Sequence, residues 1–286
     1  MPLVDHLIEL RNRLVYAVGA MFVAFLICYI FASDIFDFLV APLAQELRDA
    51  GQAELAVSLE TATEAGDSSG AVIQLETPAE PVDQAGPTLV YTSLPEVFFS
   101  YVKVAFFAGA FIAFPIIATQ LYLFIAPGLY RREKHAFLPY LVAAPILFFL
   151  GGAMVYYAIF PLAWKFFLSF QTTGENGGVS IEVLPRVGDY LNLVMKMIFA
   201  FGLAFQLPIA LTLMARAGIV SADALRRKRK FAIVGVFVVA AILTPPDIIS
   251  QVGLAVPILA LYEASIFLAR MIEKRRAERE AAEETG

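Results

Sequence analysis

Three polar side chains stand at positions where an apolar residue would cost less free energy. Glu9 lies in HLIELRNRL, directly before a long apolar run, and Glu133 lies in FIAPGLYRREKH, between two apolar runs. Gln206 lies inside an apolar run, in FAFGLAFQLPIAL. A polar group at the edge or in the middle of a membrane either holds helices together or belongs to a functional site. These residues are therefore the first candidates for function.

Each candidate also has a structural interpretation. Glu9 can pair with Arg13 four residues later on one helix, an interaction worth about 0.2–0.5 kcal/mol. Glu133 is flanked by three cations and can be a solvated loop residue. Gln206 precedes Arg216 by ten residues, about 15 Å of helical rise, which places it near the middle of a bilayer. There it can bond to a neighbouring helix or contact a partner. The spacing leaves these alternatives open.

The residue sets that catalyse reactions or bind metals are missing from the sequence. It contains one cysteine, Cys28, two histidines, His6 and His135, and no Gly-rich phosphate loop. No Ser, His and Asp set can be brought together at one side of a membrane. We therefore predict no enzymatic activity, no metal site and no cofactor.

The composition places the chain in a membrane. Of its 286 residues, 59% are hydrophobic and 16% are charged, which is more apolar surface than one soluble core can bury. Hydropathy predicts an all-α, multi-pass protein with six transmembrane helices. They are residues 14–31, 97–123, 137–160, 190–214, 231–243 and 252–268. The fifth is short, because its 13 residues rise only about 20 Å against a hydrocarbon core of about 30 Å. We expect it to form a hairpin with the sixth.

The positive charges orient these helices. Sixteen of the 21 Lys and Arg residues lie in four segments, residues 1–13, 131–135, 216–230 and 270–286. Cytoplasmic segments carry such an excess, so we predict that both termini are cytoplasmic. Lys103 and Lys196 fall inside apolar runs near their predicted outer ends, where a long side chain can extend to the membrane surface.

Two segments lie outside the predicted spans. The outer-loop insert, residues 43–87, is acidic, lacks aromatic residues, and is rich in Ala, Glu, Gly, Thr and Pro. This composition predicts that much of the segment is flexible, with a short helix over PLAQELRD. The insert is either an arm that docks a partner or a tolerated insertion, and its composition favours the insertion. The tail at 271–286 carries mixed charges and predicts a solvated helical end.

Four segments together resemble the TatC family, the multi-spanning core of the twin-arginine (Sec-independent) protein translocase. They are HLIELRNRL, FIAPGLYRREK, FAFGLAFQLPIAL and LTPPDIISQVGLAVPILALYE. The resemblance implies six helices in a curved, glove-like bundle in the cell inner (cytoplasmic) membrane. It also implies a receptor for the twin-arginine signal peptides of folded cargo proteins. The proton-motive force would drive the transport of this cargo. The implied partners are single-span TatA/TatB-type subunits and further copies of the chain.

The resemblance assigns the N-terminal segment and the first inner loop to the Arg-Arg signal. In the family, carboxylates in both segments bind the signal, and the matching positions are Glu9 and Glu133. A guanidinium presents a planar fork to carboxylate oxygens, so two adjacent arginines need two separated acceptors. Neighbouring cations hold the segment at the anionic membrane surface, and apolar neighbours contact the hydrophobic part of the signal. These flanking residues are Arg11, Arg13, Arg132, Phe124, Leu129 and Tyr130.

The resemblance also implies a region for partner helices. Many family members carry Glu where this chain has Gln206, and Gln keeps the hydrogen bonding but cannot ionise. We interpret Gln206 as a polar group that faces the concave groove and contacts a partner helix. Thr244, Asp247 and Gln251 match a polar patch at the outer end of the fifth and sixth helices, where the family docks its single-span partners.

Two other functions fit this sequence less well. A small-solute secondary transporter predicts two related halves with interrupted helices at matching places, but the sequence shows no internal repeat. A structural subunit of a respiratory complex predicts histidines within the spans, but neither His6 nor His135 lies in one. The sequence therefore favours a translocase receptor.

Overall fold

The regular elements of the described residues are helices. The computed structural model describes residues 3–64, 90, 93–125, 134–171, 185–243 and 248–284. In chain order the helices are α1 (Leu3–Ile30), α2 (Ala32–Glu64), α3 (Leu94–Ile125), α4 (Lys134–Met154), the π-helical η4 (Val155–Ile159), α5 (Phe160–Leu168), α6 (Val187–Ala204), α7 (Leu207–Arg216), α8 (Ala222–Arg227), α9 (Arg229–Leu243) and α10 (Ile248–Glu284). Within the described ranges there is no strand, and one parallel bridge joins Val90 to Arg186. The prediction of an all-α protein is confirmed.

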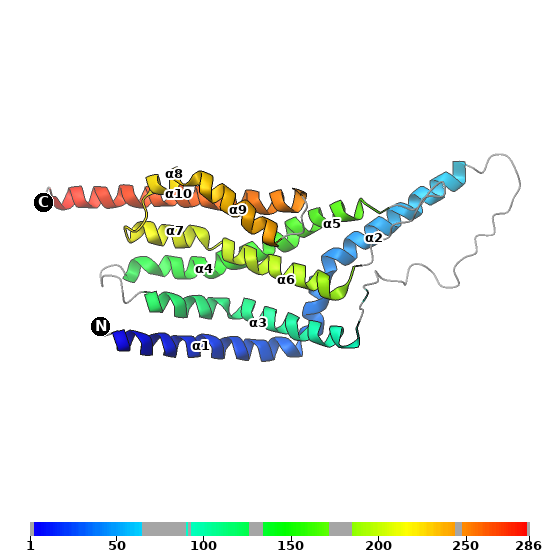
Figure 1. Ribbon diagram of the computed structural model, residues 1–286, viewed down its shortest axis with the longest axis horizontal. Coiled ribbons are helices and arrows are strands. Elements are labelled where there is room, and N and C mark those ends of the chain that lie inside the picture. The colour runs from blue at the N-terminus through cyan, green and yellow to red at the C-terminus, as the bar shows by residue number, and fades with distance from the viewer. Residues whose placement is uncertain are drawn as a thin grey trace, which may run out of the picture.

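The long helices lie side by side along one axis (Figure 1). Both ends of the chain lie at the same end of this bundle, which we call the terminal end. At the opposite end, α2 leaves the bundle at a steep angle, and α5 packs against it. Helix α1 packs mainly against α3 and forms one side of the bundle.

Five helical segments are long and apolar enough to cross a membrane. They are Leu7–Ile30, Pro95–Leu121, Pro139–Leu168, Val187–Arg216 and Gln251–Glu278. These segments indicate a multi-pass membrane protein. Helix α9 covers the predicted fifth span but has 15 residues, about 22 Å of rise, and is not among these segments. A sixth crossing through α9 therefore stays a prediction.

The predicted span at 190–214 is divided into α6 and α7. Phe205 and Gln206 form a turn between the two helices. Pro208 explains the break, because it has no N–H to donate to the Ala204 carbonyl and its ring clashes with that carbonyl. Gln206 therefore lies at a helix interruption and not within a regular helical turn.

Helix α2 is longer than the sequence analysis predicted. It runs to Glu64, whereas the short helix that we expected covers residues 42–49. The extra segment is rich in Ala, Glu and Leu, which have high helix propensity, and this propensity explains the extension. The rest of the insert, residues 65–87, falls outside the described residues, so its flexibility stays a prediction.

The core is centred on α6, whose Leu191 and Phe201 side chains are buried. Glycines let the neighbouring α4 approach closely. A Cβ atom at Gly202 would lie 2.6 Å from the Phe148 ring, and one at Gly151 would lie 2.7 Å from the carbonyl oxygen of Phe201. Helix pairs in membranes pack through such small residues.

A similar close approach joins α1 to α3. A Cβ atom at Gly109 would lie 2.7 Å from the backbone of Phe25, and the Phe25 and Phe106 rings meet edge to face with centroids 6.3 Å apart. The two helices run antiparallel (Figure 1). This packing brings the first turns of α1 against the last turns of α3 at the terminal end.

Candidate functional site

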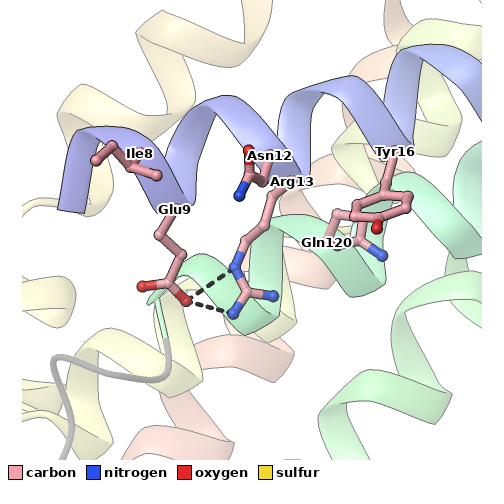
Figure 2. A pocket seen from close by; sticks show the side chains of 6 residues that line it. All are labelled: Ile8, Glu9, Asn12, Arg13, Tyr16 and Gln120. Atoms are coloured by element: carbon pink, nitrogen blue, oxygen red, sulfur yellow. Dashed lines mark hydrogen bonds and ion pairs between the residues drawn. The ribbon is translucent and has the colours of Figure 1, made fainter. Parts of the chain in front are cut away.

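A pocket of about 410 Å³ opens between α1 and α3 at the terminal end. Four of its residues, Glu9, Asn12, Arg13 and Tyr16, follow the spacing that puts side chains on one helical face. We call it the N-terminal pocket, and Figure 2 shows the six side chains that line it: Ile8, Glu9, Asn12, Arg13 and Tyr16 from α1, and Gln120 from α3.

Glu9 and Arg13 form an ion pair in the N-terminal pocket. Arg13 Nε donates to Glu9 Oε1 at 3.1 Å, and Arg13 Nη2 donates to the same oxygen. The side chains of Arg13 and Glu9 are 22% and 26% exposed, so the pair is partly shielded from solvent. The local pairing that the spacing allowed is therefore present.

The second carboxylate oxygen of Glu9 remains available. Oε2 accepts no hydrogen bond from the described residues, and it points away from Arg13 (Figure 2). An ionised carboxylate has about four lone-pair sites. Glu9 can therefore accept a second cation while it stays paired with Arg13.

Three polar residues of the pocket were not among those predicted from the sequence. Asn12, Tyr16 and Gln120 add amide and hydroxyl groups to its lining. Tyr16 and Gln120 lie beside each other, on the far side of Arg13 from Glu9 (Figure 2). Asn12 and Tyr16 could have been found, since they lie three and seven residues after Glu9 and share its helical face. Gln120 is distant in sequence, and only the packing of α3 on α1 brings it to the pocket.

The other predicted signal-binding residues are described in part. Phe124 lies half-buried near the end of α3, one turn beyond Gln120. Arg11 is exposed and donates to Asn12 Oδ1 at 3.4 Å. The described residues contain no group of three His, Cys, Asp or Glu side chains that could hold a metal ion. Four predicted residues lie outside the described ranges: Leu129, Tyr130, Arg132 and Glu133.

Gln206 bonds to a neighbouring helix. Its Nε2 donates to the Ala144 carbonyl of α4 at 2.9 Å, and the side chain is half-buried. This bond joins α4 to the break between α6 and α7, so the interhelical role that the sequence left open is present. Gln206 Oε1 accepts no hydrogen bond from the described residues. One acceptor therefore remains for another group.

The predicted partner patch is also described in part. Gln251 Nε2 in α10 donates to the Phe237 carbonyl of α9 at 3.4 Å, a long bond that joins the last two helices. Thr244 and Asp247 lie outside the described ranges.

A helical bundle with five membrane-length segments and a polar pocket at its terminal end defines the class: a multi-pass membrane protein with a site that can accept a cation. The family model for the Sec-independent protein translocase protein (TatC) matches residues 5–257. The chain belongs to the TatC family, and this confirms the resemblance that the four sequence segments indicated.

Relatives and solved structures agree with this family. The chain is 49% identical over 285 residues to the Sec-independent protein translocase protein TatC of Magnetococcus marinus, with 99% of this chain and 89% of the relative covered. It is 33% identical over 279 residues to that of Escherichia coli, with 98% and 92% covered. A crystal structure of the twin arginine translocase receptor TatC is 32% identical, has a TM-score of 0.70, and is aligned over 94% of this chain and 99% of its own. These relatives are named as protein translocase components.

Proposed function

We propose that this chain is the receptor and core subunit of a twin-arginine translocase, which binds the Arg-Arg pair of signal peptides at the cytoplasmic face. One observation carries the proposal: Glu9 is partly shielded and keeps one carboxylate oxygen free in the N-terminal pocket. A related crystal structure is named as a translocase receptor, which supports the same role.

The pocket suits an incoming guanidinium for geometric reasons. Arg13 uses Glu9 Oε1, so a signal arginine can bind Oε2 and the two cations share one carboxylate. Charge-assisted hydrogen bonds of this kind are worth about 1.5–3 kcal/mol. The Gln120 amide oxygen offers a further acceptor to guanidinium N–H groups, as does the second lone pair of Asn12 Oδ1, which already accepts from Arg11. Glu133 is the proposed acceptor for the second arginine.

The proposed orientation rests on the charge distribution. Arg11 and Arg13 lie at the terminal end, and the segments 216–230 and 270–286 add eleven of the 21 Lys and Arg residues of the chain. Because positive charge concentrates on the cytoplasmic side, the terminal end and its pocket face the cytoplasm. Helix α9 then completes six crossings of the inner membrane in a glove-like bundle.

Partner helices are proposed to bind at two polar sites. Gln206 keeps Oε1 free. Asp247 and Thr244 precede Gln251 in the chain by four and seven residues. Polar side chains of this kind hydrogen-bond between helices within a membrane. Single-span TatA/TatB-type subunits would contact these sites, further copies of the chain would join the assembly, and the proton-motive force would drive transport of folded cargo.

Binding of a twin-arginine signal peptide to the purified full-length protein tests the receptor site. Glu9→Gln should weaken binding by about tenfold or more, because it removes a charge-assisted acceptor. Glu278→Gln is the matched control, since Glu278 is also paired with a cation four residues away, Lys274, at 3.9 Å. A Lys-Lys signal should bind less tightly than an Arg-Arg signal. Equal effects of the two substitutions would contradict the proposal.

A further inference from the structure

Lys103 in α3 and Lys196 in α6 are cations within membrane-length helices. Both side chains are exposed, and neither takes part in an ion pair among the described residues. The proposed receptor function uses neither of them. An ionisable side chain within a membrane-spanning helix is uncommon and marks a functional site more often than not.

Two contacts fix the register of α3 and α6, which run parallel (Figure 1). Near the helix starts, the N–H of Gly188 donates to Glu96 Oε1 at 3.2 Å. Further along, the rings of Phe107 and Phe199 lie 5.3 Å apart. The same eleven-residue spacing, 96 to 107 and 188 to 199, separates the contacts on each helix. The register is therefore constant over this stretch.

The two lysines lie at the same level between these contacts. Lys103 is seven residues after Glu96, and Lys196 is eight residues after Gly188. The difference of one residue corresponds to about 1.5 Å along a helix axis. Because α3 and α6 are neighbours, both ammonium groups can approach one bound anion.

This level coincides with the end of α1. Gly109 of α3 packs on Phe25 of the antiparallel α1. Lys103 lies six residues before Gly109 on α3. Phe31 lies six residues after Phe25 and is the first residue after α1, so it is at the same level as Lys103. An apolar helix ends where the hydrocarbon gives way to lipid headgroups. The lysines therefore lie level with the end of the apolar segment Leu7–Ile30, on the side opposite the terminal end.

On α3 and α6, the helix faces next to the lysines are apolar in the direction of the terminal end. Phe106 lies three residues after Lys103, and Leu203 lies seven residues after Lys196, so each shares the face of its lysine. Phe106 is 52% exposed and Leu203 is 51% exposed. A phospholipid matches this combination, since its phosphate can meet two ammonium groups while its acyl chains cover the apolar faces.

We propose that Lys103 and Lys196 together bind the headgroup phosphate of one anionic phospholipid, in the leaflet at the end of the bundle opposite the termini. Lipid phosphates are abundant at this depth, and each nearby lysine attracts them. A carboxylate on a protein partner would instead have to lose its hydration to reach the same place. The lipid is therefore the occupant that the charge and the depth favour.

Native mass spectrometry of the full-length protein with phosphatidylglycerol tests this site. Lys103→Gln with Lys196→Gln should lower the affinity for phosphatidylglycerol by about fivefold for each lysine and roughly 25-fold together. Lys103→Arg with Lys196→Arg should keep the binding. The matched control is Lys165→Gln with Arg186→Gln, because these cations lie at the same end of the bundle but already face Glu46 and Asp189. The control should bind phosphatidylglycerol like the unchanged protein.

Further measurements separate the possible occupants. Phosphatidylcholine should bind more weakly than phosphatidylglycerol, and an excess of inorganic phosphate should not displace the lipid. The proposal is wrong if the Lys→Gln pair keeps its phosphatidylglycerol, or if the control pair loses as much. It is also wrong if the Lys→Gln pair keeps the lipid but no longer co-purifies with a single-span subunit, since the lysines would then bind a protein carboxylate.

Discussion

The Tyr156 ring stacks on the Phe38 ring with centroids 4.4 Å apart, and the Tyr156 hydroxyl donates to the Phe38 carbonyl at 2.6 Å. Pro42 explains why this carbonyl is available. It lies four residues after Phe38 within α2 and has no N–H to donate. The tyrosine therefore replaces the helical hydrogen bond that Pro42 removes, and it ties α2 to η4.

Tyr156→Phe should lower the free energy of unfolding by about 1–3 kcal/mol, because it leaves the Phe38 carbonyl without a donor. Thermal unfolding of the purified protein in detergent measures this change. Tyr157→Phe is the control, since the neighbouring Tyr157 is 70% exposed and should change stability little. Equal stability of the two variants would show that the Phe38 carbonyl has another donor.

Gly109→Ala should disturb the packing of α1 on α3. The added Cβ atom would lie 2.7 Å from the backbone of Phe25, and a backbone cannot move aside as a side chain can. Overpacking of this kind costs about 1–3 kcal/mol. Gly19→Ala in α1 is the control, because a Cβ atom there meets nothing within 4 Å and Ala favours the helix by up to about 1 kcal/mol. Thermal unfolding should separate the two variants in opposite directions.

Gln120→Leu should weaken binding of a twin-arginine signal peptide by about fivefold, the equivalent of one hydrogen bond of about 1 kcal/mol. The reason is that Gln120 supplies the amide of α3 to the N-terminal pocket. Gln45→Leu, at an exposed position of α2, is the control and should bind the peptide normally. Unchanged binding by the Gln120 variant would place this amide outside the peptide site.

Gln206→Leu removes the bond to the Ala144 carbonyl and should lower stability by about 0.6–2 kcal/mol. It should also reduce crosslinking to a single-span partner, while signal-peptide binding continues. Gln206→Glu should be tolerated better, because a protonated carboxyl can donate the same bond. Both crosslinks should be measured in the same membranes. If Gln206→Leu abolishes both, or if the protein no longer accumulates, the residue only stabilises the bundle and its proposed docking role is wrong.

The amino-acid sequence by itself determined the class of this protein and the ion-paired residues of its candidate site, Glu9 and Arg13. Long apolar runs indicate membrane helices wherever they occur, because a bilayer offers backbone groups no partner outside the helix. The pairing of Glu9 with Arg13 was also readable, since residues four apart on a helix are neighbours. Pro208 indicates the break at Gln206 in the sequence, although hydropathy predicts residues 190–214 as one span.

Only the tertiary structure decided which distant residues meet. No local pattern predicts that Gln120 lines the same pocket as Glu9, or that Gln206 bonds to Ala144. Both depend on how two helices pack and in which register. That register follows from close contacts such as Gly109 on Phe25, where a missing side chain on one helix admits the backbone of another. Hydropathy does not encode such contacts, since a glycine and a leucine inside an apolar run predict the same helix but allow different distances between helices.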